Sequence, residues 1–402
     1  MRLQVLELIV TIKNPFMKII VTILFFCVTL LLPAEIWAIS DPLSVDNNKY
    51  GIHIIDENDL ENAAFLVNSS GGDWGYVTIV IREDDRNNEK WQKIFDRMRQ
   101  LHLIPLVRLA TRMENAFWKK PKLEDVSSWT DFLSSLHWVT KNRYVIIFNE
   151  PNHAKEWGGS LAPVEYAQII SSFSATLKAR SDDFFILPAG LDASAPNSSI
   201  TMDERAFLNE MHAFDTDVFS YIDGWTSHSY PNPGFTGKVT AAGRGTLFTY
   251  KWEINLLKNL GVNKTLPIFI TETGWPHQEG PYINYNYLQA ENVADYLEDA
   301  SKTVWNDKNI TAITPFVLNY ESFPFANFSW QMPASQNFYP QFDSYRSLPK
   351  IAGKPELTYT ITPAPTVVHS VLGANIRSSS PSIFQLALNL IVYLQHLVYN
   401  RR

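Results

Sequence analysis

Two glutamates, each placed directly after a short apolar run, are the residues of this sequence that most clearly suggest chemistry. Glu150 follows residues 144–148 in the motif Asn-Glu-Pro-Asn, and Glu272 follows residues 267–270 in the motif Thr-Glu-Thr-Gly-Trp. Glycoside hydrolysis needs two carboxyl groups that flank one bond. One protonates the leaving oxygen and the other attacks the anomeric carbon, at a separation of about 5 to 5.5 Å in retaining enzymes. The sequence therefore predicts a site in which Glu150 and Glu272 meet.

An alternating pattern of elements would bring the two glutamates together. Between Tyr50 and Tyr320, short apolar runs alternate with longer stretches of helical periodicity, which include residues 89–101, 163–180 and 288–304. Strands buried on both faces read as continuous apolar runs, and the first run is not followed by a glycine-rich dinucleotide motif. We therefore predict an α/β fold, a closed (β/α)₈ TIM barrel. The expected strands are residues 51–55, 76–81, 104–109, 144–148, 184–188, 224–227, 267–270 and 312–317.

The carboxyl ends of barrel strands carry the chemistry of such enzymes, so the polar residues at these positions are the candidates for a site. Strands four and seven face each other across a barrel, which would place Glu150 opposite Glu272. The residues that stand at the predicted strand ends are Arg82 to Arg86, Arg108, Asn149, Glu150, His228, Tyr230, Glu272 and Trp275.

The motifs around the two glutamates resemble those of clan A glycoside hydrolases, retaining TIM-barrel enzymes. That superfamily carries Asn-Glu-Pro after strand four and a nucleophilic Glu after strand seven, and the resemblance covers about residues 50–349. It implies that Glu150 is the general acid/base and Glu272 the nucleophile, and that Asn149 hydrogen-bonds the sugar 2-hydroxyl. It also implies that Tyr230 and His228 contact the nucleophile and the sugar.

The sequence departs from the family pattern after strand eight, where members commonly place a Trp beneath the sugar. Residues 315–320 contain no Trp, so Tyr320, Phe323 or Trp330 are the candidates to replace it. Trp157 and Trp275 are predicted to contact the sugar from the wall of the cleft. The alternative for both rings is ordinary packing within their loops.

Two further polar residues lie within predicted strands. Arg108 interrupts an apolar run, and we predict that it holds Glu272 ionised through a charge-assisted hydrogen bond. A purely structural ion pair is the alternative for this arginine. His53 is predicted to be a core histidine with its hydrogen bonds satisfied.

Composition restricts the partners. The formal net charge of −7 argues against the basic surface that nucleic acid requires. No His-Glu-x-x-His motif and no pair of cysteines is present, so we predict no metal and no cofactor. The carboxylate pair and the family resemblance make a carbohydrate the expected partner.

The amino-terminal segment, residues 1–38, has the pattern of a secretory signal. An apolar run at 19–32 follows Lys13 and Lys18 and precedes a small-residue site that ends at Ala38. We predict an exported protein, secreted or held at the cell surface or membrane. An uncleaved membrane segment is the alternative to a cleaved signal.

After a catalytic domain predicted at residues 39–357, the composition changes. Residues 358–382 are rich in Thr, Pro and Ser, as in a linker, and residues 383–402 form an apolar tail. The tail is at the short limit for crossing a bilayer, and it would collect several polar residues in one stripe if helical. It therefore spans a membrane, lies on one or docks on the barrel, and the sequence does not distinguish these alternatives.

Together these features predict a retaining glycosidase that cleaves β-linked oligo- or polysaccharide by double displacement through a glycosyl-enzyme intermediate. Two alternatives remain at this stage. One is a non-catalytic carbohydrate-binding barrel at the cell surface, and the other is a transglycosylase that uses the same carboxylate pair.

Overall fold

Eight strands form two parallel sheets in the computed structural model, which describes residues 39–358. The larger sheet has the order β1-β2-β3-β6-β7 and the smaller one β10-β9-β8, and every neighbouring pair in them is parallel. The strands are β1 (Gly51–His53), β2 (Gly75–Arg82), β3 (Leu103–Ala110), β6 (Arg143–Ile146), β7 (Phe184–Leu187), β8 (Trp225–His228), β9 (Ile268–Glu272) and β10 (Ile310–Ile313). A small antiparallel pair, β4 (Met113–Glu114) and β5 (Phe117–Trp118), follows β3.

Each predicted strand corresponds to one of these eight, and the last differs most in its bounds. It ends at Ile313, although residues 312–317 were expected. Beyond that point the backbone still bonds to β9 and β1, but irregularly: the nitrogen of Thr314 donates to Ile270, that of Phe316 to Thr273 and that of Leu318 to His53. The apolar run is therefore longer than the strand because its second half is buried without forming a regular ladder.

Additional bridges connect the edge strands of the two sheets. Tyr50 forms a parallel bridge with Ile313 beside β1 and β10, and Asp192, which follows β7, forms one with His228 of β8. The nitrogen of Ile313 also donates to the carbonyl of Lys49 at 2.8 Å. Because all the pairings are parallel, the eight strands end on the same side, where the predicted site residues stand.

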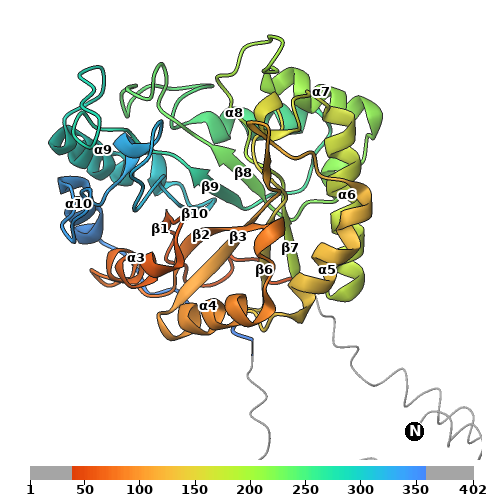
Figure 1. Cartoon of the computed structure of the whole chain (residues 1–402), viewed down its shortest axis with the longest axis horizontal. Coiled ribbons are helices and arrows are strands. Elements are labelled where there is room, and N and C mark those ends of the chain that lie inside the picture. Colours follow the sequence, from red (N-terminus) through yellow and green to blue (C-terminus); the bar gives the residue numbers. More distant parts are fainter. Residues whose placement is uncertain (1–38, 359–402) are drawn as a thin grey trace, which may run out of the picture. The chain divides into compact units, whose positions relative to one another are not determined.

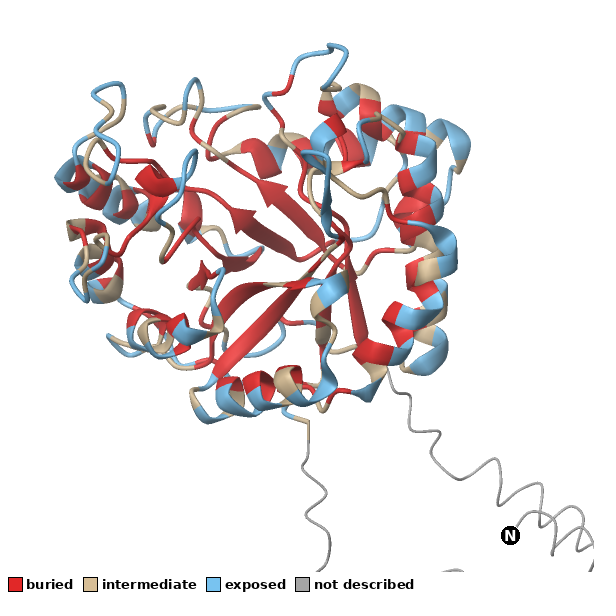
Figure 2. Ribbon diagram, in the orientation of Figure 1, coloured by how far each residue is buried: buried red, intermediate tan, exposed pale blue. Residues whose placement is uncertain are grey.

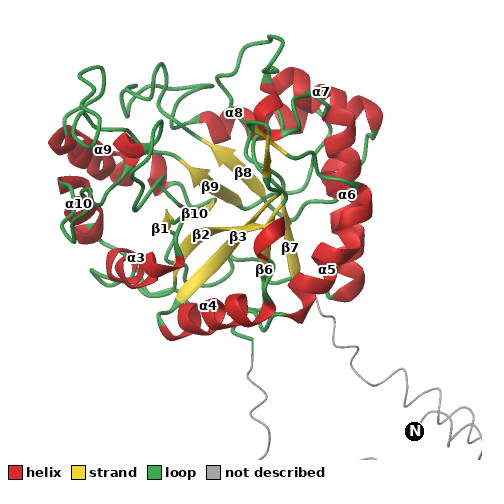
Figure 3. Ribbon diagram, in the orientation of Figure 1, coloured by secondary structure: helices red, strands yellow, loops and turns green. Residues whose placement is uncertain are grey.

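Helices surround the strands (Figures 1 and 3). The predicted helix at 163–180 is present with those bounds, and those at 89–101 and 288–304 are present with slightly different ends. The α-helices are α3 (Leu60–Val67), α4 (Asn88–Gln100), α5 (Val126–Ser135), α6 (Pro163–Arg180), α7 (Glu204–Phe214), α8 (Thr249–Asn259), α9 (Ala290–Lys302) and α10 (Pro340–Ser347). Short 3₁₀ turns are η1 (Glu57–Asp59), η2 (Glu83–Asp85), η3 (Leu123–Asp125), η4 (Ala154–Glu156), η5 (Val218–Ser220), η6 (Val304–Asn306) and η7 (Ala326–Phe328).

Local sequence explains where the helices begin and which face they bury. The side chain of Asn87 caps α4 by accepting from the nitrogen of Lys90 at 2.9 Å, and Pro163 occupies the first turn of α6. The buried residues of α4, from Trp91 to Met98, are spaced to form one face. Figure 2 shows the result, with buried strands inside and helices exposed on their outer faces.

Aromatic side chains pack between β6 and β9, the two strands that lead to the glutamates. Tyr144 of β6 packs on Phe269 of β9, with ring centroids 5.4 Å apart, and Phe185 of β7 lies 5.7 Å from Phe269. All three rings are buried. This packing sets β6 and β9 against each other across the interior, so the loop after β6 and the end of β9 lie close in space.

The predicted terminal segments at 1–38 and 383–402 lie outside the described residues, as does the predicted linker from residue 359 onward. Its first residue, Thr358, still donates a backbone hydrogen bond to Val139. Among residues 39–358, no helix combines the length and the apolar character needed to cross a bilayer.

Candidate active site

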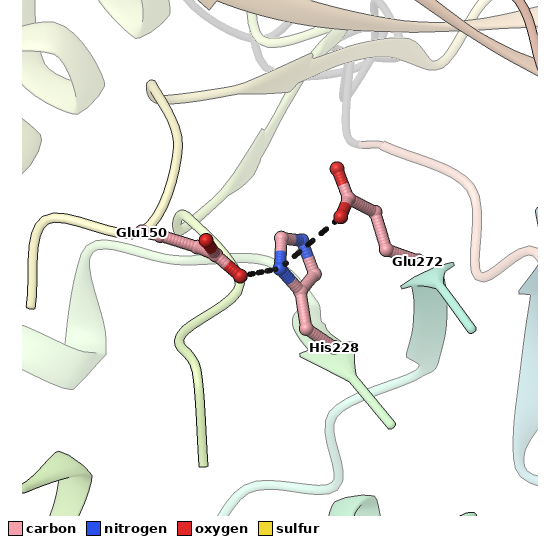
Figure 4. Close-up of side chains that lie close together, drawn as sticks. All are labelled: Glu150, His228 and Glu272. Atoms are coloured by element: carbon pink, nitrogen blue, oxygen red, sulfur yellow. Dashed lines mark hydrogen bonds and ion pairs between the residues drawn. The ribbon is translucent and has the colours of Figure 1, made fainter. Parts of the chain in front are cut away.

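Glu150, His228 and Glu272 form one cluster at the carboxyl ends of β6, β8 and β9 (Figure 4). A carboxylate oxygen of each glutamate and a ring nitrogen of the histidine all lie within 4.8 Å of one another. Figure 4 shows the imidazole between the two carboxylates. The structure thus brings the two glutamates together, as the sequence predicts.

The backbone around Glu150 is unusual. Phe148 and Glu150 both have positive φ angles, 67° and 33°, in the left-handed region that residues other than glycine seldom adopt. The nitrogen of Glu150 donates to the carbonyl of Gly190 at 3.2 Å, and its own carbonyl accepts from His153 at 2.9 Å. Such backbone persists where its surroundings enforce it, and it is common at functional sites.

Glu272 is the last residue of β9, and its carboxylate is buried among hydrogen-bond donors. Nη1 of Arg108 donates to Oε1, and Oη of Tyr230 donates to Oε2 at 3.1 Å. Burial opposes ionisation, but the positive charges of His228 and Arg108 outweigh it and lower the pKa of Glu272 to about 2. This carboxylate is therefore ionised at neutral pH, in agreement with the prediction that Arg108 holds it in that state.

Arg108 also positions the residue that precedes Glu150. Its Nη1 lies 2.8 Å from Oδ1 of Asn149 and donates to it. One guanidinium on β3 thus contacts residues that follow β6 and β9. The contact orients the side-chain amide of Asn149, whose nitrogen can donate to other groups.

His228 connects the two carboxylates. Its Nδ1 is 2.7 Å from Oε1 of Glu150 and 3.7 Å from Oε2 of Glu272. Burial opposes protonation of the ring, but the negative charges of Glu272 and Glu150 outweigh it and raise the pKa of His228. Burial and the same two charges raise the pKa of Tyr230, which therefore stays a neutral phenol that donates to Glu272.

Gly190 leaves the space in which His228 lies. A Cβ atom at this position would be 2.2 Å from Cδ2 and 2.5 Å from Nε2 of His228, closer than atoms can approach. We expect Gly190→Ala to displace the imidazole of His228. The change should lower kcat/KM by about 10²-fold, the cost that a misplacement of about 1 Å can have. Steady-state kinetics on a cleaved substrate would measure the loss.

Two comparisons test this explanation. Gly224→Ala crowds Leu187 and Phe269 in the core and should lower the melting temperature while changing kcat/KM much less. In a His228→Ala background, Gly190→Ala should cost little additional activity, because its target is gone. Fully additive losses would contradict a role that acts through His228.

His53 is buried in β1, as predicted, but neither ring nitrogen has a hydrogen-bond partner among the described residues. The expectation of a satisfied histidine is therefore wrong. Its ring packs on Phe316 at 5.2 Å between centroids. Burial, followed by the positive charge of Arg108, lowers the pKa of His53 to about 3. The ring is an uncharged part of the floor beneath the site.

Replacing His53 by Leu should reduce the acid sensitivity of the fold. Below its ordinary pKa of 6.5 the histidine takes up a proton in the unfolded chain, whereas the folded protein does so only near pH 3. Wild-type stability is therefore lost as the pH falls from about 6.5 towards 3. Between pH 7 and 4.5, urea unfolding should show about 2 to 3 kcal/mol less loss in His53→Leu than in the wild type. Equal losses in both proteins would contradict this explanation.

The structure corrects the prediction for Trp157 and Trp275, which were expected to contact the sugar. Both side chains are buried. The indole of Trp157 packs edge-on against Tyr166, with centroids 5.6 Å apart, and that of Trp275 against Tyr296 at 5.4 Å. Nε1 of Trp275 donates to the carbonyl of Gly237 at 2.9 Å. These rings hold their loops in place and present no face to a ligand.

Among the candidates for the missing Trp after strand eight, Trp330 is buried against Tyr345, so it cannot serve as an open platform. Tyr320 is partly exposed and Phe323 is largely exposed. Phe316 lies in the same segment after strand eight. Its ring packs over His53 and contacts Phe325, with ring centroids 5.5 Å apart.

Glu156 is a residue near the site that the sequence analysis missed. It ends η4, in the loop that begins with Glu150, and its side chain hydrogen-bonds Asn149. Burial and the negative charge of Glu150 raise the pKa of Glu156 to about 7. Its place in the loop of the Asn-Glu-Pro motif was the available signal. Its approach to Asn149 depends on the course of that loop, which the motif does not specify.

The cluster of Glu150, His228 and Glu272 has ligand types that suit a metal, but its electrostatics favour another use. The guanidinium of Arg108 is paired with the carboxylate of Glu272, and its positive charge would repel a cation. His228 binds a proton more readily than an isolated imidazole, and a proton there competes with a metal. Hydrogen bonds from Arg108 and with His228 thus offset the negative charges of the two glutamates.

No protein-family model and no curated protein matches this sequence. Solved structures do. A monomeric β-xylosidase from Caulobacter crescentus CB15 matches with a TM-score of 0.50 and 13% identity, over 75% of this chain and 68% of that one. This chain shares the xylosidase's α/β fold.

Two further matches have lower TM-scores. An endo-β-1,3-glucanase from Pseudomonas viridiflava has a TM-score of 0.47 and 14% identity, over 76% of this chain and 99% of that one. A β-mannanase from Thermomonospora fusca has a TM-score of 0.48 and 13% identity, over 78% of this chain and 93% of that one.

Proposed function

We propose that this protein is a retaining glycoside hydrolase that cleaves β-linked oligo- or polysaccharide. The observation that carries the proposal is the approach of Glu150 and Glu272, whose nearest carboxylate oxygens lie within 4.8 Å. Retaining enzymes hold their carboxyl groups about 5 to 5.5 Å apart, whereas inverting enzymes need about 6.5 to 9.5 Å for an intervening water. The short separation favours direct attack on the sugar by one of the two carboxylates.

The proposal includes a closed (β/α)₈ barrel as the scaffold. The bridges between Tyr50 and Ile313, and between Asp192 and His228, support closure because they join both edges of the larger sheet to the smaller one. In a barrel the loops after the strands surround a single rim, which is where the carboxylate pair lies.

In the first step, the ionised Glu272 attacks the anomeric carbon while the protonated form of Glu150 gives its proton to the leaving oxygen. The bond from the sugar to the leaving group breaks, and a glycosyl ester with Glu272 forms. In the second step, Glu150 takes a proton from a water molecule, and that water displaces Glu272 from the anomeric carbon. The sugar is released with its original configuration, and both glutamates return to their starting states.

The other residues of the cluster position this pair. Arg108 and Tyr230 donate to different oxygens of Glu272, so they stabilise the carboxylate as a leaving group in the second step. His228 holds Glu150 through its 2.7 Å contact. Asn149 accepts from Arg108 at Oδ1, and its amide nitrogen has two N–H donors, of which Glu156 takes one. The other remains for the sugar 2-hydroxyl, the role that the family resemblance implies.

The amino-terminal signal pattern supports a second part of the proposal, that this chemistry takes place outside the cytoplasm. A polysaccharide too large to enter a cell would be reached there. Recovery of the enzyme in the medium or at the cell surface, and its loss from those fractions when residues 1–38 are removed, would test this part.

Product stereochemistry tests the mechanism. The purified protein would be incubated with β-1,3- and β-1,4-linked glucans, mannan and xylan, and reducing ends would be measured. For a substrate that is cleaved, proton NMR should show the β-anomer first, before mutarotation. An α-anomer as the first product would contradict the retaining mechanism. Tight binding with no release of sugar from any glycan would instead indicate a carbohydrate-binding protein.

A further inference from the structure

Two loops near the candidate site expose an unusual amount of aromatic surface. The loop after β9, residues 278–288, includes Tyr282 with 50% of its surface exposed, and the loop after β10, residues 319–329, includes Phe323 with 78% and Phe325 with 43% exposed. Apolar side chains gathered in this way on a soluble surface commonly mark a binding site.

The two loops are held to each other. Asn327 is buried, and its Nδ2 lies 2.8 Å from the carbonyl oxygens of His277 and of Tyr282 and donates to them. The nitrogen of His277 donates in turn to the carbonyl of Asn327 at 2.8 Å. The rings of Tyr282 and Phe323 pack edge to face, with centroids 6.3 Å apart. The exposed rings therefore stand on a built support, which lowers the cost of ordering them around a ligand.

A series of ring contacts connects this surface with the carboxylate pair. Tyr230, which donates to Glu272, lies 5.8 Å from Phe328 between ring centroids. Phe328 lies 5.7 Å from Phe316, and Phe316 lies 5.5 Å from Phe325. Phe316 and Phe328 belong to a small apolar cluster separate from the main core. The exposed aromatic surface is thus continuous with the wall of the candidate site.

The chemistry of the two loops indicates what would cover them. They contain no Lys or Arg, and their only charged residues are Glu279 and Glu321. Phosphate-bearing ligands such as nucleic acids or anionic lipids would find no counter-charge here. Tyrosine, phenylalanine and asparagine side chains instead suit neutral sugars, which offer flat C–H faces and many hydroxyl groups.

We infer that residues 278–288 and 319–329 form a platform for sugar units that lie beyond the pair at which cleavage takes place. The inference rests on the proposed function and extends it. A platform next to the carboxylates makes the preferred substrate a chain of several β-linked sugars. A single sugar with a small leaving group would occupy only the site at Glu150 and Glu272 and leave Tyr282, Phe323 and Phe325 uncovered.

The test compares long and short substrates in three variants. In Tyr282→Ala/Phe323→Ala, and separately in Phe325→Ala, kcat/KM on the best polysaccharide should fall at least about tenfold, the usual cost of losing an aromatic anchor. Activity on the aryl glycoside of the same sugar should stay within about twofold. Phe323→Tyr, which keeps a flat ring, should retain wild-type behaviour.

Phe214→Ala is the matched control, because this ring is also about half exposed but ends α7, away from the loops that follow the strands. It should leave both substrates unaffected, and melting temperatures should show that every variant is folded. Equal kcat/KM on the polysaccharide in the wild type and the double variant would overturn the inference.

Binding separates this inference from the proposed function. Affinity electrophoresis in gels that contain each polysaccharide would be run on Glu272→Gln with and without the platform changes. Retardation that depends on Tyr282 and Phe323 supports the platform, even if the wild-type protein releases no sugar and the proposed hydrolysis fails. Retardation that the changes do not alter, or none in any gel, overturns it. Analytical ultracentrifugation would show whether the changes abolish a dimer instead, in which case a second copy covers the surface and the platform is refuted.

Discussion

Replacing Glu272 by Gln is expected to lower kcat by more than about 10⁴-fold, the scale of loss when a covalent nucleophile is removed. An amide cannot form the glycosyl ester, but it keeps the size of the side chain. Its oxygen can still accept from Arg108, and its NH2 group can donate to the hydroxyl oxygen of Tyr230. The fold should therefore persist. Kinetics on the substrate identified in the glycan panel, together with far-ultraviolet circular dichroism and thermal melting, would measure both effects.

Glu124→Gln provides the control for this loss, because Glu124 is an exposed glutamate paired with Lys122 at the surface. Its activity should match the wild type. If Glu272→Gln kept more than a few per cent of wild-type turnover, Glu272 would not be the nucleophile. Trapping with a 2-deoxy-2-fluoro glycoside and peptide mapping would then show which residue carries the sugar.

The same carboxylate has a consequence for acid stability. The folded pKa of Glu272, about 2, is below its ordinary value of 4.5. Its contribution to stability is therefore fully present above about pH 4.5 and is lost as the pH falls towards 2. Glu272 stays ionised above this range, so a loss of activity at mildly acidic pH would come from other groups or from unfolding.

The strands were predictable because burial on both faces leaves a plain signal. All four residues of Phe184–Leu187 are buried, and the sequence shows them as an uninterrupted apolar run. The ends of such runs also located Glu150 and Glu272, since parallel strands bring their carboxyl ends to one side. A run does not show where a ladder stops, however: the apolar residues after Ile313 are buried, but their backbone hydrogen bonds no longer form a regular ladder.

Other features of the site depend on contacts that a single sequence does not encode locally. The local sequence around a Trp does not show whether its ring packs inward or faces a ligand. The burial of Trp157 and Trp275 could therefore not be predicted from their motifs. Gly190 matters because His228 lies against it, and that contact joins the segment after β7 to the end of β8. The short-range pattern gives no sign of either contact.

Replacing Glu150 by Ala is expected to have an effect that depends on the leaving group. For a polysaccharide, whose leaving alcohol needs a proton, kcat/KM should fall by about 10² to 10⁴-fold. A dinitrophenyl glycoside leaves as a stable anion without protonation, so its first step should stay fast. The glycosyl ester on Glu272 should then accumulate, and a burst of phenolate would precede slow turnover. Glu89→Ala, at an exposed glutamate paired with Lys93 on α4, is the matched control and should show neither change.

Azide distinguishes the two glutamates, because this small anion attacks the sugar without needing a base. In Glu150→Ala it should replace water in the second step, speed the turnover of the dinitrophenyl glycoside and give a β-glycosyl azide. In Glu272→Ala it should occupy the space of the lost carboxylate, attack from that face and give an α-glycosyl azide. The opposite pairing of products and variants would show that the two roles are exchanged. Identical products from both variants would contradict a mechanism in which Glu150 and Glu272 act on opposite faces of one anomeric carbon.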